Sequence, residues 1–218
     1  MTGLPCDGVR EGGFAIAPEW NDLPRVARDH RGRPGDPVNL AVAGETADIE
    51  AAFAAAGWFQ TSRETLGAAL RSVGAYTLKR PYRNLPISHL WLLGRPQDIA
   101  FAKPVGRTIS QRHHVRFWRT PLRLPDGRPV WLGAASFDIA MHRVSVLHRI
   151  APEVDIERDD LIANLEAAGV VAERCQVGWA DPTEDGHNAA GDPYCTDGAL
   201  GIAVLRPAPS AGEEAEAK

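Results

Sequence analysis

The chain has 218 residues, of which 44% are hydrophobic and 24% charged, and its formal net charge is -4. This composition is that of a globular protein with a buried core, and it excludes fibrous and largely disordered classes. The acidic balance argues against general nucleic-acid binding, which needs a basic face. No apolar run approaches the ~20 residues that cross a bilayer, and no secretory signal is visible at the start. We therefore expect no membrane span and a cytoplasmic location.

Three regions follow from the distribution of residue types. Residues 1–36 are rich in Gly, Pro, Arg and Asp and predict an N-terminal arm that docks through Phe14, Ile16 and Trp20. Residues 37–206 predict one globular domain. Residues 207–218 consist largely of Ala, Glu and Pro, which is typical of a disordered tail.

Apolar spacing predicts two or three helices. The first begins at Thr46, as its N-cap, and ends at Gly57; the second occupies 62–74. The clearest helix spans 155–168, with acidic residues in its first turn and Gly169 after its end.

Alternating or short apolar runs predict strands at 38–43, 88–93, 99–102, 143–150, 170–177 and 201–205. Residues 94–98 are expected to join the second and third of these runs as a hairpin, and a polar loop is expected before 201. The predicted fold is a single α+β domain, mainly an antiparallel sheet with two or three helices packed on one face.

The central hairpin spans 111–138 around Leu124-Pro125-Asp126-Gly127. With this turn, His114 lies opposite Ser136 and Arg112 opposite Asp138. Alternation then places Arg112, His114 and Arg116 on one face, and His113, Val115 and Phe117 on the other. The first face is the best candidate for a site.

Two functions are open for this face. Guanidinium groups of Arg112 and Arg116 beside His114 favour binding of a small phosphate or carboxylate, which such groups hold in a bidentate way. The alternative is a hydrolase of phosphate or ester bonds, in which His114 or His148 is the acid or base and Asp138 orients it. A third reading is structural, with the same side chains paired to neighbouring acidic residues.

A divalent metal is the one cofactor for which ligand types are present. His114, Asp138, His142 and His148 come from neighbouring strands and are the types that zinc, iron or manganese bind. No metal-binding motif with fixed spacing occurs, and no nucleotide-binding loop, so we predict no cofactor.

The three cysteines, Cys6, Cys175 and Cys195, form no Cys-x-x-Cys pair and no zinc spacing. Reduced thiols are expected in the cytosol, and the alternative is a Cys175–Cys195 disulfide.

Several motifs in order resemble the LssY-type C-terminal domain family: 36–41 (Asp-Pro-Val-Asn-Leu-Ala), 94–98 (Gly-Arg-Pro-Gln-Asp), 112–119 (Arg-His-His-Val-Arg-Phe-Trp-Arg), 154–158 (Val-Asp-Ile-Glu-Arg) and 191–194 (Gly-Asp-Pro-Tyr). The resemblance covers about 37–207, and Arg158, within the motif at 154–158, is a further candidate ligand-binding residue. The family is of unknown function, so it implies no catalytic residues.

In that family the domain is often fused to membrane segments of the phosphatidic-acid-phosphatase or DedA type. The resemblance therefore implies a membrane-protein partner as the alternative to a small anionic ligand, and with it a place at the inner face of the membrane. This chain departs from the family pattern by having no such segments, by Arg149 where a second His is usual, and by Cys195 where an aromatic residue is expected.

Overall fold

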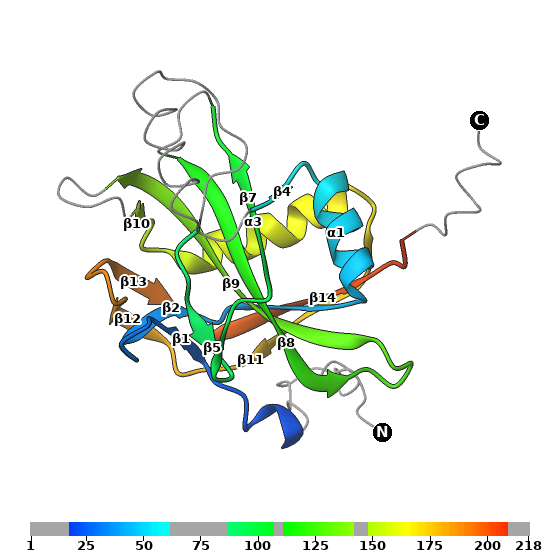
Figure 1. Cartoon of the computed structure of the whole chain (residues 1–218), viewed down its shortest axis with the longest axis horizontal. Coiled ribbons are helices and arrows are strands. Elements are labelled where there is room, and N and C mark those ends of the chain that lie inside the picture. The colour runs from blue at the N-terminus through cyan, green and yellow to red at the C-terminus, as the bar shows by residue number, and fades with distance from the viewer. Residues whose placement is uncertain (1–17, 62–86, 107–110, 142–147, 209–218) are drawn as a thin grey trace.

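An eight-stranded sheet forms the centre of the molecule (Figure 1). The computed structural model describes residues 18–61, 87–106, 111–141 and 148–208. The strand order is β11-β14-β3-β9-β8-β7-β4, with β10 paired to β9. The strands are β3 (Leu40–Ala43), β4 (Phe59–Gln60), β7 (Ile99–Pro104), β8 (Arg112–Arg123), β9 (Pro129–Met141), β10 (His148–Ile150), β11 (Val171–Gly178) and β14 (Ala199–Leu205). All these pairs are antiparallel except β14 and β3, which run parallel. The expected α+β class is confirmed in outline, with strand more abundant than helix.

The long β8–β9 hairpin sets the register of this sheet. Its turn is closed by hydrogen bonds of 2.8 Å from Leu124 N to Arg128 O and 2.9 Å from Gly127 N to Leu124 O. Gly127 has φ 89°, a value that glycine adopts without a Cβ clash. Arg112 pairs with Asp138 and His114 with Ser136, so the predicted register is confirmed.

Two helices, α1 (Thr46–Ala55) and α3 (Val154–Ala167), cover one face of the sheet. Their buried apolar side chains pack on Val115 and Phe117 of β8; they are Ile49, Ala52 and Phe53 from α1, and Leu161, Ile162 and Leu165 from α3. The N-cap of α1 is Glu45, so the expectation of Thr46 was wrong by one residue. The side chain of Asp48 accepts the backbone N–H of Glu45 at 2.8 Å, which fixes the cap one position earlier.

A second, smaller sheet in the order β2-β1-β5-β6 covers part of the opposite face. Its strands are β1 (Val26–Arg28), β2 (Pro34–Pro37), β5 (Trp91–Leu92) and β6 (Arg95–Pro96), and a 3-10 helix, η1 (Pro18–Trp20), precedes it. Trp20 and Ala27 are buried in a cluster that also contains Trp118 of β8 and Leu132 of β9. Both faces of the central hairpin are therefore inside the protein.

The predicted hairpin between 88–93 and 99–102 was wrong. β5 turns back after Leu93 and Gly94, with φ 53° and 74°, and pairs with β6. Two consecutive residues with positive φ make a tight two-residue hairpin, so the return strand starts at Arg95. β7 instead joins the large sheet between β8 and β4.

The loop expected between β11 and β14 contains a further antiparallel pair, β12 (Thr183–His187) and β13 (Pro193–Thr196). Figure 1 shows this pair beside β1 and β2, at the end of the molecule away from α1. The predicted helix at 62–74, residues 143–147 of the predicted strand at 143–150, and residues 209–218 of the tail lie outside the described residues.

The cysteine predictions need correction. Cys175 is disulfide-bonded, whereas Cys195 is a free thiol. These two cysteines therefore do not pair with each other, and Cys175 is not in the reduced form that was expected. Among the residues that the structure describes, no helix is long and apolar enough to cross a membrane.

Candidate functional site

The central hairpin gathers a row of polar side chains on the face that the small sheet partly covers. Arg112, His114 and Arg116 come from β8, and their cross-strand neighbours on β9 include Ser136 and Asp138. Residues directly opposite each other on paired strands present their side chains to the same face. All five are buried, with relative exposures of 0 to 5%. We call these five residues the polar row.

One end of the polar row is a buried ion pair. Arg112 Nε donates to Asp138 Oδ2 at 2.6 Å. Asp138 Oδ1 lies 3.3 Å from His114 Nδ1, which is close enough for electrostatic attraction. The carboxylate thus stands between the guanidinium and the imidazole, and its charge compensates that of Arg112.

Arg116 connects the polar row to the elements that cover it. Its Nη1 donates to Asp36 Oδ2 at 2.9 Å, and its Nε and Nη2 donate to the carbonyl oxygen and hydroxyl of Ser88 at 3.1 and 3.2 Å. Burial lowers the pKa of Arg116 from its ordinary value, while the carboxylates of Asp36 and Asp138 oppose that effect. Arginine remains charged in proteins, so the side chain is a buried cation held between two carboxylates.

The tautomer of His114 follows from its neighbour. Arg116 Nη1 lies 2.9 Å from His114 Nε2, and a guanidinium can only donate, so Nε2 is the acceptor. The imidazole is then neutral and carries its proton on Nδ1. Among the described residues, this N–H group faces Asp138 Oδ1 at 3.3 Å without meeting hydrogen-bond geometry, and the hydroxyl of Ser136, on the residue directly across the strand pair, has no hydrogen-bond partner. Buried polar atoms nearly always have partners, so the unpartnered hydroxyl of Ser136 in the polar row needs an explanation.

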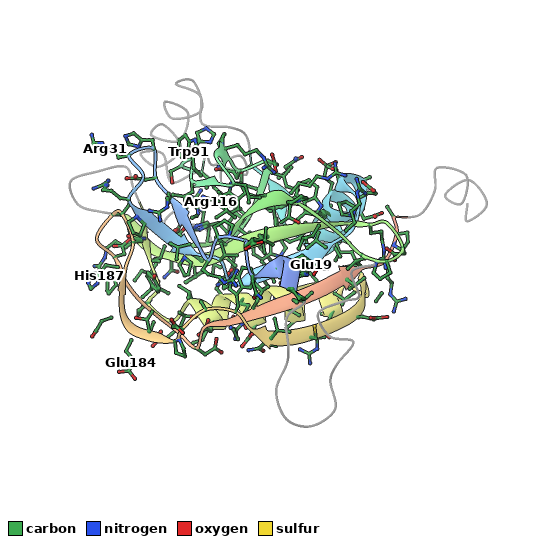
Figure 2. The ribbon with its side chains drawn as sticks, turned by 90° about the horizontal axis from the view of Figure 1, so that it is seen from below. Glu19, Arg31, Trp91, Arg116, Glu184 and His187 are labelled. Carbon is green, nitrogen blue, oxygen red and sulfur yellow. The ribbon has the colours of Figure 1, made fainter. Side chains whose placement is uncertain are left out.

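The wall beyond Arg116 is formed by residues that sequence reasoning did not select. Asn188, in the turn between β12 and β13, donates to Asp36 Oδ1 at 3.3 Å. Tyr194 on β13 is also buried, and burial together with the charge of Asp36 raises the pKa of its phenol. In Figure 2, Arg116 lies inward of Arg31 and of His187, which is at the outer edge of β12.

Arg158 is not part of this arrangement. It lies on α3, where its Nε donates to Asp159 at 2.7 Å and its Nη1 donates to Asp197 at 2.8 Å. Burial acts to lower the pKa of Arg158, but the hydrogen bonds to the two carboxylates outweigh it and raise the pKa. The structure brings Arg112, His114, Arg116 and Asp138 together, and it places Arg158 elsewhere in a salt-bridge cluster of its own.

The two remaining candidate metal ligands are His142 and His148, whose side chains the structure does not describe. His148 pairs with Met141 through the backbone, its side chain is outside the described part, and so is His142. Within 18–61, 87–106, 111–141 and 148–208, no three His, Cys, Asp or Glu side chains gather closely enough to hold a metal ion.

A family model described as LssY C-terminus matches residues 20–200. The chain belongs to the LssY C-terminal family. No curated protein and no solved structure matches it. The matched region of this LssY C-terminal domain starts before residue 37, and it contains Asp36, Asn188 and the whole polar row.

The LssY C-terminal domain has a second buried polar contact on the other face of β8. His113 Nδ1 lies 2.7 Å from Glu157 Oε2 on α3, and His113 packs against the ring of Phe137 with centroids 4.8 Å apart. Burial raises the pKa of Glu157, and the hydrogen bond to His113 acts in the opposite direction. This contact ties α3 to the sheet and is separated from the polar row by the strand itself.

Sequence signals for the missed residues were uneven. Asp36 and Tyr194 lie in two of the motifs that carried the family resemblance, 36–41 and 191–194, but both motifs also read as turns. Asn188 follows a run of polar residues and has no distinguishing pattern. Its role depends on the β12–β13 pair, which brings it to a residue 152 positions away in the chain.

Proposed function

We propose that this LssY C-terminal domain binds a small oxyanion, a phosphate or a carboxylate, along the polar row. The observation that carries the proposal is the buried hydroxyl of Ser136, which has no hydrogen-bond partner among the described residues and lies in a row with two buried guanidinium groups. A carboxylate offers only acceptors and a phosphate mainly acceptors, and the polar row offers donors to them through its guanidinium N–H, imidazole N–H and hydroxyl groups, with Asp138 as its one carboxylate. A bound ligand would supply the partner that the Ser136 hydroxyl lacks.

The energetic cost of an unpartnered buried hydroxyl favours a ligand over a purely structural role for the polar row. A buried polar atom without a partner costs about 1–3 kcal/mol. Arg116 already donates hydrogen bonds to Asp36 and Ser88. A structural role for Arg116 therefore does not require the Ser136 hydroxyl as a further acceptor. Alanine at 136 would fill almost the same space without the polar atom. A hydroxyl that costs stability in the empty protein is consistent with a use in binding.

The experiment is Ser136→Ala with titration calorimetry of inorganic phosphate and acetate, at constant ionic strength. We expect the variant to bind about tenfold more weakly, the value of one hydrogen bond to a charged ligand. The empty variant should be as stable as the wild type or more stable in urea, because an unsatisfied hydroxyl has been removed. Thr183→Ala, which removes a hydroxyl from β12, is the matched control and should leave binding unchanged.

Two results contradict this proposal. One is a wild-type protein that binds neither phosphate nor acetate. The other is a Ser136→Ala variant that binds like the wild type while losing stability, which would make the hydroxyl structural. Arg116→Ala completes the set and should abolish binding, since it removes a cation from the polar row.

A hydrolase is the second candidate, because Ser136, His114 and Asp138 place a hydroxyl, an imidazole and a carboxylate on one face. It ranks lower because His114 Nε2 already accepts a hydrogen bond from Arg116 and cannot take a proton while that contact persists. Turnover of nitrophenyl phosphate or nitrophenyl acetate would reverse the ranking. So would near-stoichiometric zinc, iron or manganese in protein purified without chelator, if Asp138→Ala removed it; His142 and His148 would then be the remaining ligands to test.

A further inference from the structure

Asp36 occupies the position on Arg116 that the proposed oxyanion would take. Its Oδ2 accepts from Arg116 Nη1 at 2.9 Å, and the same nitrogen contacts His114. The side chains of Asp36 and Arg116 are 8% and 6% exposed, so the contact is inside the protein. A carboxylate is itself an oxyanion with the acceptor geometry that guanidinium recognises. We propose that Asp36 is an internal competitor for the binding site, an inference that rests on the proposed function.

The charges of the site support an exchange. Arg112 is paired with Asp138 and Arg116 with Asp36, so these two guanidinium groups and two carboxylates together carry no net charge. When Asp36 leaves Arg116, one positive charge is uncompensated, and a monoanion restores neutrality. A buried unpaired charge is unfavourable, so departure of Asp36 and arrival of the ligand are coupled. The ligand class is therefore a compact anion with one net charge and at least two oxygens.

Asp36 makes a second side-chain contact, to Asn188, which is weaker than its contact to Arg116. Its other oxygen accepts from Asn188 Nδ2 at 3.3 Å, near the long end of hydrogen-bond distances. Asn188 is itself fixed by its own turn, because its Oδ1 accepts from the backbone N–H groups of Ala190 and Asp192 at 3.0 Å each. Asn188 therefore selects the orientation in which Asp36 faces Arg116.

The elements that carry these two residues are peripheral to the large sheet. Asp36 is on β2, at one edge of the small sheet, and Asn188 joins β12 to β13, which pair with each other as a two-stranded sheet. A hydrogen bond of 2.8 Å from Cys195 N to Pro152 O ties β13 to the body of the protein. Movement at Asp36 and Asn188 can thus expose Arg116 without breaking the β8–β9 ladder. The polar row stays fixed while Asp36 and Asn188, which cover it, move.

The test is Asp36→Asn, which keeps the shape and an acceptor oxygen but removes the charge. We expect inorganic phosphate and acetate to bind about tenfold more tightly than to the wild type, because a competing, well-populated closed state has been weakened. Asp185→Asn is the matched control: it makes the same change in net charge at an exposed position on β12. It should leave both affinities unchanged. Chloride at equal ionic strength corrects for general screening.

Asn188→Ala provides an independent reading if Asp36→Asn does not fold. It removes the hydrogen bond to Asp36 Oδ1 and leaves every charge in place, so we expect tighter binding of phosphate by about twofold to fivefold. Circular dichroism and urea unfolding of each variant establish that it is folded before binding is measured.

The outcomes separate this inference from the function on which it rests. Wild-type binding that Arg116→Ala abolishes, with no gain in Asp36→Asn or Asn188→Ala, keeps the binding function and overturns the role of Asp36. Weaker binding in Asp36→Asn overturns it too, since Asp36 would then be a ligand-binding residue. If the wild type, Asp36→Asn and Asn188→Ala all fail to bind phosphate and acetate, both proposals fall.

Discussion

A methyl group added at Gly201 would enter the contact between β14 and α3. An ideal Cβ there lies 2.6 Å from Ile162 Cδ1 and 3.1 Å from both Cγ and Cδ of Arg158. The Ile162 methyl is the end of a flexible side chain, but Arg158 is anchored by hydrogen bonds to Asp155, Asp159 and Asp197. Ile162 can therefore move away from the added methyl group, whereas Arg158 cannot easily do so.

This geometry sets the size of the effect of Gly201→Ala. Overpacking in a well-filled core costs about 1–3 kcal/mol, and we expect a loss of unfolding free energy in that range by urea denaturation. Gly178→Ala is the control, because its added Cβ meets nothing within 4 Å. Gly→Ala at a site without strain gains about 0.4–1 kcal/mol through the unfolded chain, so the two alanines should differ in sign.

A second substitution identifies the contact responsible. Ile162→Val removes Cδ1 and alone should cost about 0.5–1.5 kcal/mol. In the Gly201→Ala background it should cost less or stabilise, which gives a coupling energy of at least about 0.5 kcal/mol. Additive effects, or equal stability of Gly201→Ala and Gly178→Ala, would refute the proposed packing of α3 on β14.

Two further predictions concern pH and the attachment of the N-terminal segment. Burial raises the pKa of Glu157, so the folded state keeps the carboxyl proton to higher pH than the unfolded chain does. The contribution of Glu157 to the free energy of unfolding therefore falls as the pH rises from about 4.5 through the raised pKa. Glu157→Gln should therefore gain stability relative to wild type between about pH 4 and pH 8, and a constant difference in urea midpoints would contradict this. Arg25 lies 3.5 Å from the Trp179 ring centroid and donates to Trp179 O at 2.7 Å. Arg25→Lys should cost about 1–3 kcal/mol in thermal unfolding, whereas Arg28→Lys, at an exposed position, should change little; equal effects would exclude a specific stacking role.

Local sequence was sufficient for the central hairpin and for the ends of two helices. A short turn motif fixes where two strands reverse, and alternation then fixes which side chains share a face. The pairings of His114 with Ser136 and of Arg112 with Asp138 followed from those two rules. Gly57 and Gly169, with φ 78° and 72°, end α1 and α3 because each helix terminus needs a residue that accepts a left-handed backbone.

One strand pairing depended on an unusual turn conformation and another on a contact between distant segments, and local patterns encode neither. β5 pairs with β6 and not β7 because of a two-residue turn in which Leu93, a residue that seldom does so, has a positive φ. The parallel pairing of β3 with β14 joins segments about 160 residues apart, and no sequence period specifies it.

For the candidate site too, some properties follow from the sequence and others from the tertiary structure. The sequence by itself determined that Arg112, His114 and Arg116 share one face, since the period of a strand is two residues. Only the tertiary structure decided that this face is buried, that Asp36 arrives on it from 80 residues away, and that Asn188 holds Asp36 there. Burial and counter-ions are properties of the packed chain, because a carboxylate and a guanidinium distant in sequence meet only when the elements that carry them dock.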